Sequence, residues 1–438
     1  MYVTHRVLLK LLLFGQIAFV VNQVHFLWLP GLGPIAPVNL LFLLTLIALR
    51  AKPDTIDPPG VLRGALIGFF AALTFAFLWA QVRASGDLLD DATYFKNAIF
   101  YPLYYFIFLK SRQDEKTTRQ IIIWILIIAA LAGLEGLREG LDYGFGKYNP
   151  MHRASGPFGV DWHNANRAGV FYGMFWPMFV ALLLFLRRRK LWRLAAIGGC
   201  IVIAGGTLAT YSRQSYFLVL LGTAVLLVRK NIVAAVVISV TLISLAGYLP
   251  DSVFQRVEET KQTNQRGEEQ VDESTSGRWE LWAGAMSMFA SNPLGVGLNR
   301  FKKEIGNYSP HKGFDAHNFY VLTLAECGPF GIISLLYLIY SCFVLGRFLR
   351  HNTDPEEPEL MALTIGFSVC TLNMALGGIY GSPTLEGSVM TPYWALAGSL
   401  ERYVHLKAQN RGMVAAAPAG PSLAERFPLA AYLPGRRK

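Results

Sequence analysis

The sequence predicts an all-α integral membrane protein with about twelve transmembrane helices and one long loop outside the membrane. Of its 438 residues, 53% are hydrophobic and 16% are charged, whereas a soluble protein carries about a quarter charged residues. Apolar runs of roughly 20 residues, the length that crosses a bilayer, recur along nearly the whole chain. The expected spans are 7–28, 35–49, 61–82, 95–109, 119–137, 168–186, 191–209, 214–228, 232–249, 318–348, 359–380 and 388–405.

These runs favour helices over strands. Segments such as 11–13 and 121–128 are continuously apolar and lack the alternation of a strand. A helix also satisfies every backbone polar group within its own segment, as a membrane requires. The first run is too long for the apolar part of a signal peptide and lacks a clear cleavage site, so we expect a retained span.

The connecting segments alternate in charge, which predicts the topology. One set is short and densely basic, for example 187–193 and 110–119, and the positive-inside rule places it in the cytoplasm. Both chain termini are expected on that side because the number of spans is even. The net charge of +11 is spread over many short loops, so it indicates orientation in the bilayer and disfavours a nucleic-acid partner.

The expected organisation has four parts. Residues 1–249 hold the first nine spans, 250–317 form the long outer loop, 318–405 hold the last three spans, and 406–438 form a basic cytoplasmic tail. Within the loop, 256–276 is polar and is expected to be mobile. Residues 278–290 show apolar residues at helical spacing but are too short to span. They predict a helix at the membrane interface, with Trp279 and Trp282 at headgroup depth.

His317 ends the long outer loop, directly before the apolar run 318–348. The positive end of a helix dipole disfavours protonation of a nearby imidazole, and free amides there favour a phosphate. A neutral imidazole at physiological pH can act as a general base. The alternative is an interfacial histidine that only caps the helix or packs.

Two arginines are the main candidates for binding a phosphate. Arg213 lies in a very short outer loop between two spans, where a flanking Arg is disfavoured, so a diphosphate partner is preferred over simple snorkelling. Arg278 opens the expected interfacial helix, where the dipole opposes a cation. Either a phosphate or a salt bridge, for example to Glu280, would offset that cost.

Four further residues are weaker candidates. Arg153 and Arg167 either bind phosphate or are solvated loop charges, and the second interpretation is preferred. Asp315 either orients the His317 imidazole or faces solvent, and again the second is preferred. Asn318 is a candidate as the immediate neighbour of His317.

No metal or cofactor is expected. The acidic residues of the long loop match no compact cation site. The four cysteines all fall within apolar spans and make no zinc-type spacing. The chain also contains no dinucleotide-binding, P-loop or nucleophile-elbow motif.

Together the motifs resemble the O-antigen ligase family of bacterial inner-membrane proteins, which is related to O-oligosaccharyltransferases and some polysaccharide polymerases. The matching pieces occur in the family's order and cover about residues 153–331. They are Arg153–Gly156 with Asn164 and Asn166, Thr210–Arg213, Arg278–Trp282 leading into Asn292–Gly297, and His317-Asn318 followed, after nine intervening residues, by Gly328-Pro329-Phe330-Gly331.

The resemblance implies a GT-C-like membrane glycosyltransferase of the bacterial inner membrane, with its active site facing the periplasm. It implies inverting, metal-independent transfer of a glycan from undecaprenyl diphosphate to a sugar hydroxyl of lipid A–core, in lipopolysaccharide biosynthesis. By position, His317 would be the base, and Arg213 and Arg278 would bind the diphosphate.

Three alternatives stay open at this point. A protein O-oligosaccharyltransferase or a polysaccharide polymerase would use the same lipid-linked donor; the short basic tail favours the ligase over the former. A polytopic transporter is a candidate from another class. The gathering of notable polar residues on one outer face favours surface chemistry over transport.

Overall fold

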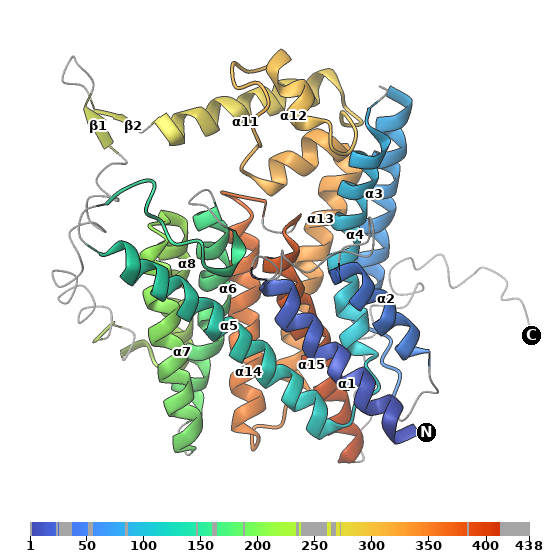
Figure 1. The fold of residues 1–438 in the computed structure, drawn as a ribbon, viewed down its shortest axis with the longest axis vertical. Coiled ribbons are helices and arrows are strands. Elements are labelled where there is room, and N and C mark those ends of the chain that lie inside the picture. Colours follow the sequence, from blue (N-terminus) through green and yellow to red (C-terminus); the bar gives the residue numbers. More distant parts are fainter. Residues whose placement is uncertain are drawn as a thin grey trace, which may run out of the picture.

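The computed structural model describes residues 2–22, 25, 37–50, 56–83, 86–145, 148–159, 164–186, 189–233, 236–237, 261–263, 269–271, 273–382 and 385–411. Over these residues the protein is all-α, with 13 α-helices and one short hairpin (Figure 1). The helices are α1 Tyr2–Val21, α2 Pro37–Leu49, α3 Arg63–Arg83, α4 Leu88–Leu109, α5 Glu115–Tyr143, α6 Ala165–Phe185, α7 Lys190–Ala209, α8 Arg213–Lys230, α11 Glu273–Ser291, α12 Phe301–Glu304, α13 Phe319–His351, α14 Pro358–Gly377 and α15 Gly387–Asn410.

Six of the described helices are long and apolar enough to cross a membrane: α3, α5, α6, α7, α13 and α14. The helices α1, α2, α4, α8 and α15 also coincide with expected spans but do not meet that measure. For example, α2 has 13 residues, and α8 carries three basic residues at its ends. The expected span 232–249 lies almost entirely outside the described residues. The chain is a multi-pass membrane protein, and the number of twelve crossings stays a prediction.

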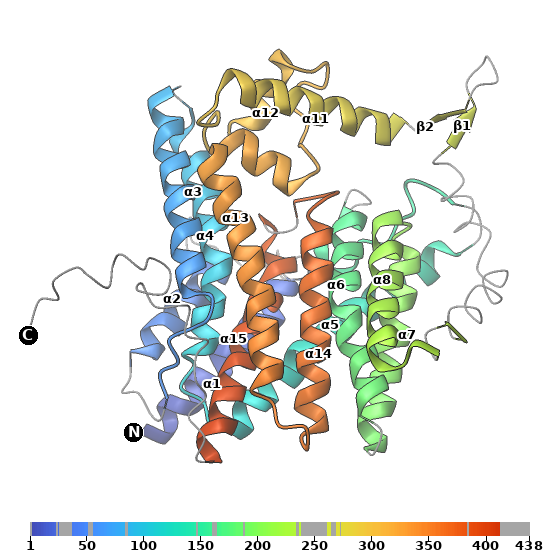
Figure 2. The same ribbon diagram turned by 180° about the vertical axis from the view of Figure 1, so that it is seen from behind.

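The long helices form a bundle, and α11 and α12 lie across one end of it (Figures 1 and 2). Within the bundle α6 is largely buried, because it packs against α7, α8 and α14. Its aromatic side chains Phe171, Tyr172 and Phe175 are fully buried. The Tyr172 hydroxyl donates to the carbonyl of Ala132 in α5 at 2.8 Å, so the phenol is satisfied inside the apolar core.

The helix expected near 278–290 is longer than the sequence indicated, because α11 begins at Glu273. Arg278 therefore lies inside the helix, and the dipole argument made for it as a first residue is wrong. The apolar residues Leu281, Ala285 and Met288 are buried in one cluster with residues of the following loop and of α13. The helical spacing of α11 thus reflects packing on the protein itself.

The long polar segment before α11 contains some regular structure. Strand β1, Lys261–Thr263, pairs antiparallel with β2, Glu269–Val271. The other residues of 256–272 lie outside the described part of the chain, so the expected mobility of this segment stays a prediction.

The helix α13 is kinked at Gly328, which has φ +62° and precedes Pro329. The kink frees carbonyl groups of the preceding turn, and the loop after α11 pairs with them. Val296 donates to the carbonyl of Ala325, and Gly297 donates to that of Glu326, both at 2.9 Å. The two glycine-containing motifs of the sequence are therefore partners in one contact that docks the outer loop onto α13.

A buried ion pair ties the same loop to α4. The Arg300 guanidinium contacts both carboxylate oxygens of Asp91 at 2.6 Å, and both side chains are almost completely buried. Burial alone would raise the pKa of Asp91, but hydrogen bonds from Arg300, Gln81 and Asn299 outweigh it and hold the pKa at about 2. The outer loop is thus fixed on one side to α4 and on the other to α13.

Candidate active site

His317 has an unusual backbone conformation directly before the N-cap of α13. Its φ is +48°, in the left-handed region that non-glycine residues rarely adopt. Its amide donates to Asp315 Oδ1 at 3.0 Å, while Asp315 Oδ2 pairs with Lys302 Nζ at 3.3 Å. Asp315 therefore neither stands alone in solvent nor bonds the imidazole. It shapes the backbone that presents the exposed His317 side chain.

The backbone amides at the start of α13, beside His317, already donate hydrogen bonds to protein groups. Asn318 is the N-cap, and its side chain accepts from the amides of Tyr320 and Val321 at 3.0 and 3.1 Å. The amide of Phe319 donates to the carbonyl of Gly378 at 2.8 Å. The expectation that free amides here attract a phosphate is therefore wrong, since these groups already have partners. Positive charge for an anion must come from side chains.

Helix α11 brings Arg278 to this place. Trp282 Nε1 donates to the carbonyl of Ala316 at 2.9 Å, which fixes α11 to the residue before His317. The Trp282 ring also lies 6.0 Å from the ring of Tyr380. One turn earlier, the Arg278 guanidinium lies 5.9 Å from the same Tyr380 ring. The position of α11 over the start of α13 thus brings Arg278 and Tyr380 to the side of the molecule that carries His317.

The surroundings of His317 lower the pKa of its imidazole. Its pKa is lowered, first because surrounding protein displaces water from the ring, and further by the positive charges of Arg278 and Lys302. The Asp315 carboxylate opposes this lowering. Because the side chain keeps contact with solvent, the displacement of water is only partial. The net effect favours the neutral form of the imidazole, which is the form that can accept a proton.

Arg213 begins α8 at the same end of the bundle. The next residue, Gln214, donates to the carbonyl of Gly377 at 2.7 Å, and the adjacent carbonyl of Gly378 accepts from Phe319. The starts of α8 and α13 therefore both rest on the last turn of α14. Arg213 is half-buried, and this shared contact places it on the side of the molecule that carries His317.

Arg153 is a structural residue. Its side chain is almost fully buried, and the guanidinium donates to the carbonyl of Thr210 at 2.9 Å and to Asn166 Oδ1 at 2.7 Å. The interpretation of Arg153 as a solvated loop charge is therefore wrong. The contact with Thr210 holds the turn that leads into Arg213.

Arg167 pairs with Glu386 at 2.7 Å, and no sequence motif indicates this glutamate. Arg167 also donates to Asn164 Oδ1 at 2.8 Å, so it is an exposed but paired charge. Burial raises the pKa of Glu386, with a further contribution from Asp315; the charges of Arg167 and Lys302 lower it. A lone Glu in a loop carries no spacing signal. Its only sequence signal is its position at the outer end of the last expected span.

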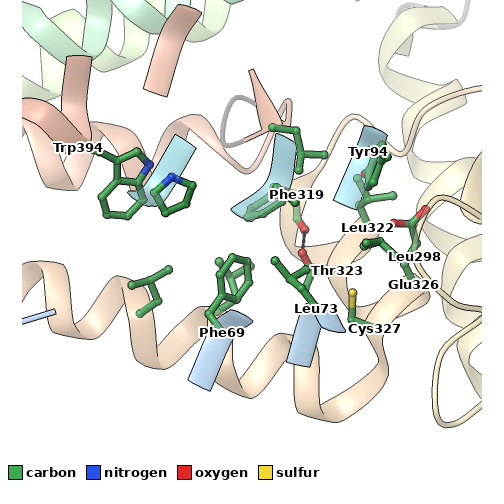
Figure 3. Close-up of a pocket in the computed structure, with 15 residues that line it drawn as sticks. Phe69, Leu73, Tyr94, Leu298, Phe319, Leu322, Thr323, Glu326, Cys327 and Trp394 are labelled. Atoms are coloured by element: carbon green, nitrogen blue, oxygen red, sulfur yellow. Dashed lines mark hydrogen bonds between the residues drawn. The ribbon is translucent and has the colours of Figure 1, made fainter. Parts of the chain in front are cut away.

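A narrow apolar cavity lies next to the start of α13 (Figure 3). Its volume is about 30 Å³, and its lining includes Phe319 and Leu385, the neighbours of the site along the chain. The buried Glu326 also lines it and accepts from the amide of Phe301 at 3.0 Å. A cavity of this size holds little more than a water molecule, so in this conformation it is no tunnel for a lipid chain.

The assembled groups can bind an anion and move a proton. The cations Arg278 and Lys302 lie within electrostatic range of the His317 imidazole. Glu386, which pairs with Arg167, lies within electrostatic range of Asp315 and Lys302. A guanidinium beside a neutral imidazole suits a substrate that carries phosphate and a hydroxyl to be deprotonated.

The fold and this site define a multi-pass membrane protein with cationic side chains and a histidine gathered at one end of its helical bundle. Residues 198–336 match the family model described as O-antigen ligase, Wzy_C. The chain thus carries an O-antigen ligase family domain, and this family includes ligases and polymerases that transfer glycosyl groups. No curated protein matches the chain.

The matched segment runs from α7 into α13. It contains the three residues that the motifs singled out, Arg213, Arg278 and His317. The supporting residues Arg153 and Glu386 lie outside it and come from the α5–α6 and α14–α15 connections.

Proposed function

We propose that the protein is an O-antigen ligase of the bacterial inner membrane. It transfers a glycan from undecaprenyl diphosphate to a sugar hydroxyl of lipid A–core, at the periplasmic face. The observation that supports the proposal is the hydrogen bond from Trp282 of α11 to Ala316, which brings Arg278 within electrostatic range of His317 in the matched domain. The family implies a lipid-linked glycan as substrate.

In the proposed reaction, Arg213 and Arg278 bind the two phosphates of the donor. The acceptor oxygen attacks the anomeric carbon while His317 takes its proton. The bond from the anomeric carbon to the diphosphate breaks, its electron pair leaves with the diphosphate, and the configuration inverts. The transition state resembles an oxocarbenium ion. Arginines aimed at the leaving group stabilise the charge that grows there.

The neighbouring residues have positioning roles in this proposal. Asp315 and Asn318 set the backbone around His317, because one accepts from its amide and the other caps the next helix. Arg153 holds the turn before Arg213. Arg167 pairs with Glu386 and keeps that carboxylate from neutralising the cations beside His317.

We further propose that the reaction needs no metal, because protein cations already supply the positive charge for the leaving diphosphate. Transfer should be unchanged after exhaustive treatment with a chelator. A loss of activity that Mg²⁺ or Mn²⁺ restores would contradict this part of the proposal.

The proposed architecture is GT-C-like, with about twelve crossings and both termini in the cytoplasm. Residues 1–249 supply nine crossings and 318–405 three, 250–317 lie in the periplasm, and 406–438 form the cytoplasmic tail. Six apolar helices of sufficient length support such an arrangement.

The deciding experiment is reconstitution in proteoliposomes with an undecaprenyl-diphosphate glycan as donor. The acceptor is lipid A–core, a protein, or a second molecule of the lipid-linked glycan. We expect the glycan to appear on lipid A–core. Its appearance on a protein would indicate an O-oligosaccharyltransferase, and its extension on the lipid diphosphate would indicate a polymerase. Movement of the donor across the bilayer without any transfer would indicate a transporter.

A further inference from the structure

A second, basic cavity lies at the end of the bundle opposite the candidate active site. Helix α15 connects the two: Glu386 precedes its first residue, and its last turns line the cavity. Its 24 residues cover about 36 Å, close to the thickness of a bilayer core. The start of α1 and the end of α15 lie side by side there (Figures 1 and 2). The volume is about 800 Å³, and the lining residues are Arg6, Arg112, Asp114, Glu115, Lys116, Arg119, Leu406, Gln409 and Asn410.

The carboxylates of this cavity are already engaged by protein groups. Glu115 contacts Lys407 Nζ at 2.5 Å and accepts from Asn410 at 2.6 Å. Asp114 is the N-cap of α5 and accepts from the amide of Thr117 at 2.7 Å. Of the cations, Arg119 is held by a bidentate contact with Glu359. The charge that the cavity presents is therefore positive.

Arg112 supplies the strongest indication of an anion-binding site. Its backbone is left-handed, with φ +56°. Its Nη1 is buried, yet has no hydrogen-bond partner among the described residues. The fully buried Arg402 lies within electrostatic range of Arg112 and donates only to backbone carbonyls, of Leu109 and Gln113. A buried guanidinium nitrogen without a described partner, on a residue that lines a basic cavity, favours a bound anion.

The surroundings of the cavity indicate that the anion belongs to a lipid. On α1, directly after the lining residue Arg6, the apolar side chains of Val7, Leu8 and Leu11 are 50–62% exposed. Apolar side chains that begin where the cations end match an anionic headgroup with its acyl chains. A soluble phosphate would make no use of the exposed face of α1.

We propose that this cavity binds the headgroup of an anionic phospholipid, with its phosphodiester on Arg112 and Lys116 and its acyl chains along α1. Basic pockets where helices leave the bilayer are suited to such headgroups. The site is independent of the proposed glycan transfer, because it involves none of the residues of the candidate active site.

The test measures binding of phosphatidylglycerol to the full-length protein by native mass spectrometry from detergent. The double variant Arg112→Gln/Lys116→Gln should bind it about thirtyfold more weakly, since each cation at an anionic membrane contributes roughly a factor of five. Lys116→Gln alone, at an exposed position, should lose about fivefold and guards against a folding defect in the double variant.

The matched control is Lys190→Gln/Arg193→Gln, which removes two exposed cations from the start of α7 at the same end of the bundle. It should bind phosphatidylglycerol like the unmodified protein. Equal losses in both double variants, or equal binding of phosphatidylcholine, would overturn the proposal. Competition by glycerol phosphate as strong as by the lipid would overturn it too, because it would identify a site for a soluble anion.

Discussion

At the scale of single residues, the neighbours of His317 decide what it can do. The sequence places a histidine before an apolar helix, which fits a base or a cap equally well. The structure gives the capping role to Asn318 and the backbone role to Asp315. The imidazole makes neither of these contacts, so the side chain is available to accept a proton.

We expect His317→Gln to lower the transfer rate by about 10²- to 10⁴-fold, the range of a general base, while donor binding is kept. The measurement is transfer to lipid A–core in proteoliposomes. The matched control is His311→Gln, which removes a histidine of the same loop whose ring contacts Glu280 at 2.9 Å. Transfer by the His317 variant within about tenfold of the unmodified protein would assign the base to another residue.

The pH dependence follows from the charges around the ring. Because the pKa of His317 is lowered, the base stays unprotonated to a lower pH, and the acid limb of kcat/KM should lie below the ordinary histidine value of 6.5. Arg278→Gln removes a cation and should raise the pKa. Asp315→Asn removes an anion and should lower it further.

The two shifts can be read directly by NMR titration of the histidine ring, with His317→Gln identifying the signal. Shifts of the same sign in both variants would contradict the electrostatic arrangement. Because this readout needs no turnover, it also applies to variants that no longer transfer glycan.

At the scale of elements, the apolar runs predict most helices to within a few residues. The last spans expected at 359–380 and 388–405 appear as α14 and α15. The interfacial position expected for α11 stays a prediction, because apolar residues at helical spacing mark a face that avoids water, and the spacing is the same whether protein or lipid covers that face. Only the position of the loop after α11 shows that protein covers it.

The Gly328 motif shows a similar limit to prediction from the sequence. Its glycine and proline predict a break in α13, but the partner of the break lies in the loop after α11. A Cβ on Gly328 would stand 2.6 Å from the carbonyl carbon of Leu294, and one on Gly295 would stand 2.4 Å from the carbonyl oxygen of Glu326. The two backbones meet at a distance that only glycine allows.

We therefore expect Gly328→Ala to destabilise the protein by more than the cost of a left-handed alanine, which is about 1–2 kcal/mol. Gly313→Ala is the matched control, because Gly313 has φ +82° but open space around its Cβ position. The thermal unfolding midpoint should fall more for Gly328→Ala, and its transfer rate should fall as well. Equal midpoints would mean that the contact with Leu294 contributes nothing.

At the scale of the whole molecule, the charge pattern predicts which end of the bundle faces which compartment. The candidate active site and the basic cavity occupy opposite ends of α15. If the positive-inside rule holds here, the first faces the periplasm and the second the cytoplasm.

Cysteine labelling can check this orientation. Ser287 is exposed on α11, and Glu356 is exposed in the turn between α13 and α14. In a Cys200→Ser background, where the other native cysteines are buried, a membrane-impermeant maleimide should label Ser287→Cys from the periplasm. It should label Glu356→Cys only after the inner membrane is opened. The reverse pattern would invert the topology and remove the proposed periplasmic reaction.

The sequence by itself determined the membrane class, the position of most helices and the identity of His317, Arg213 and Arg278 as candidates. These depend on local apolar runs, on charge in short loops and on motif spacing, all of which can be read along the chain. The tertiary structure decided the contacts between distant segments: α11 over the start of α13, Arg153 under the turn before α8, and Glu386 beside Arg167. Those pairs are far apart in sequence, and only packing of the bundle brings their side chains together.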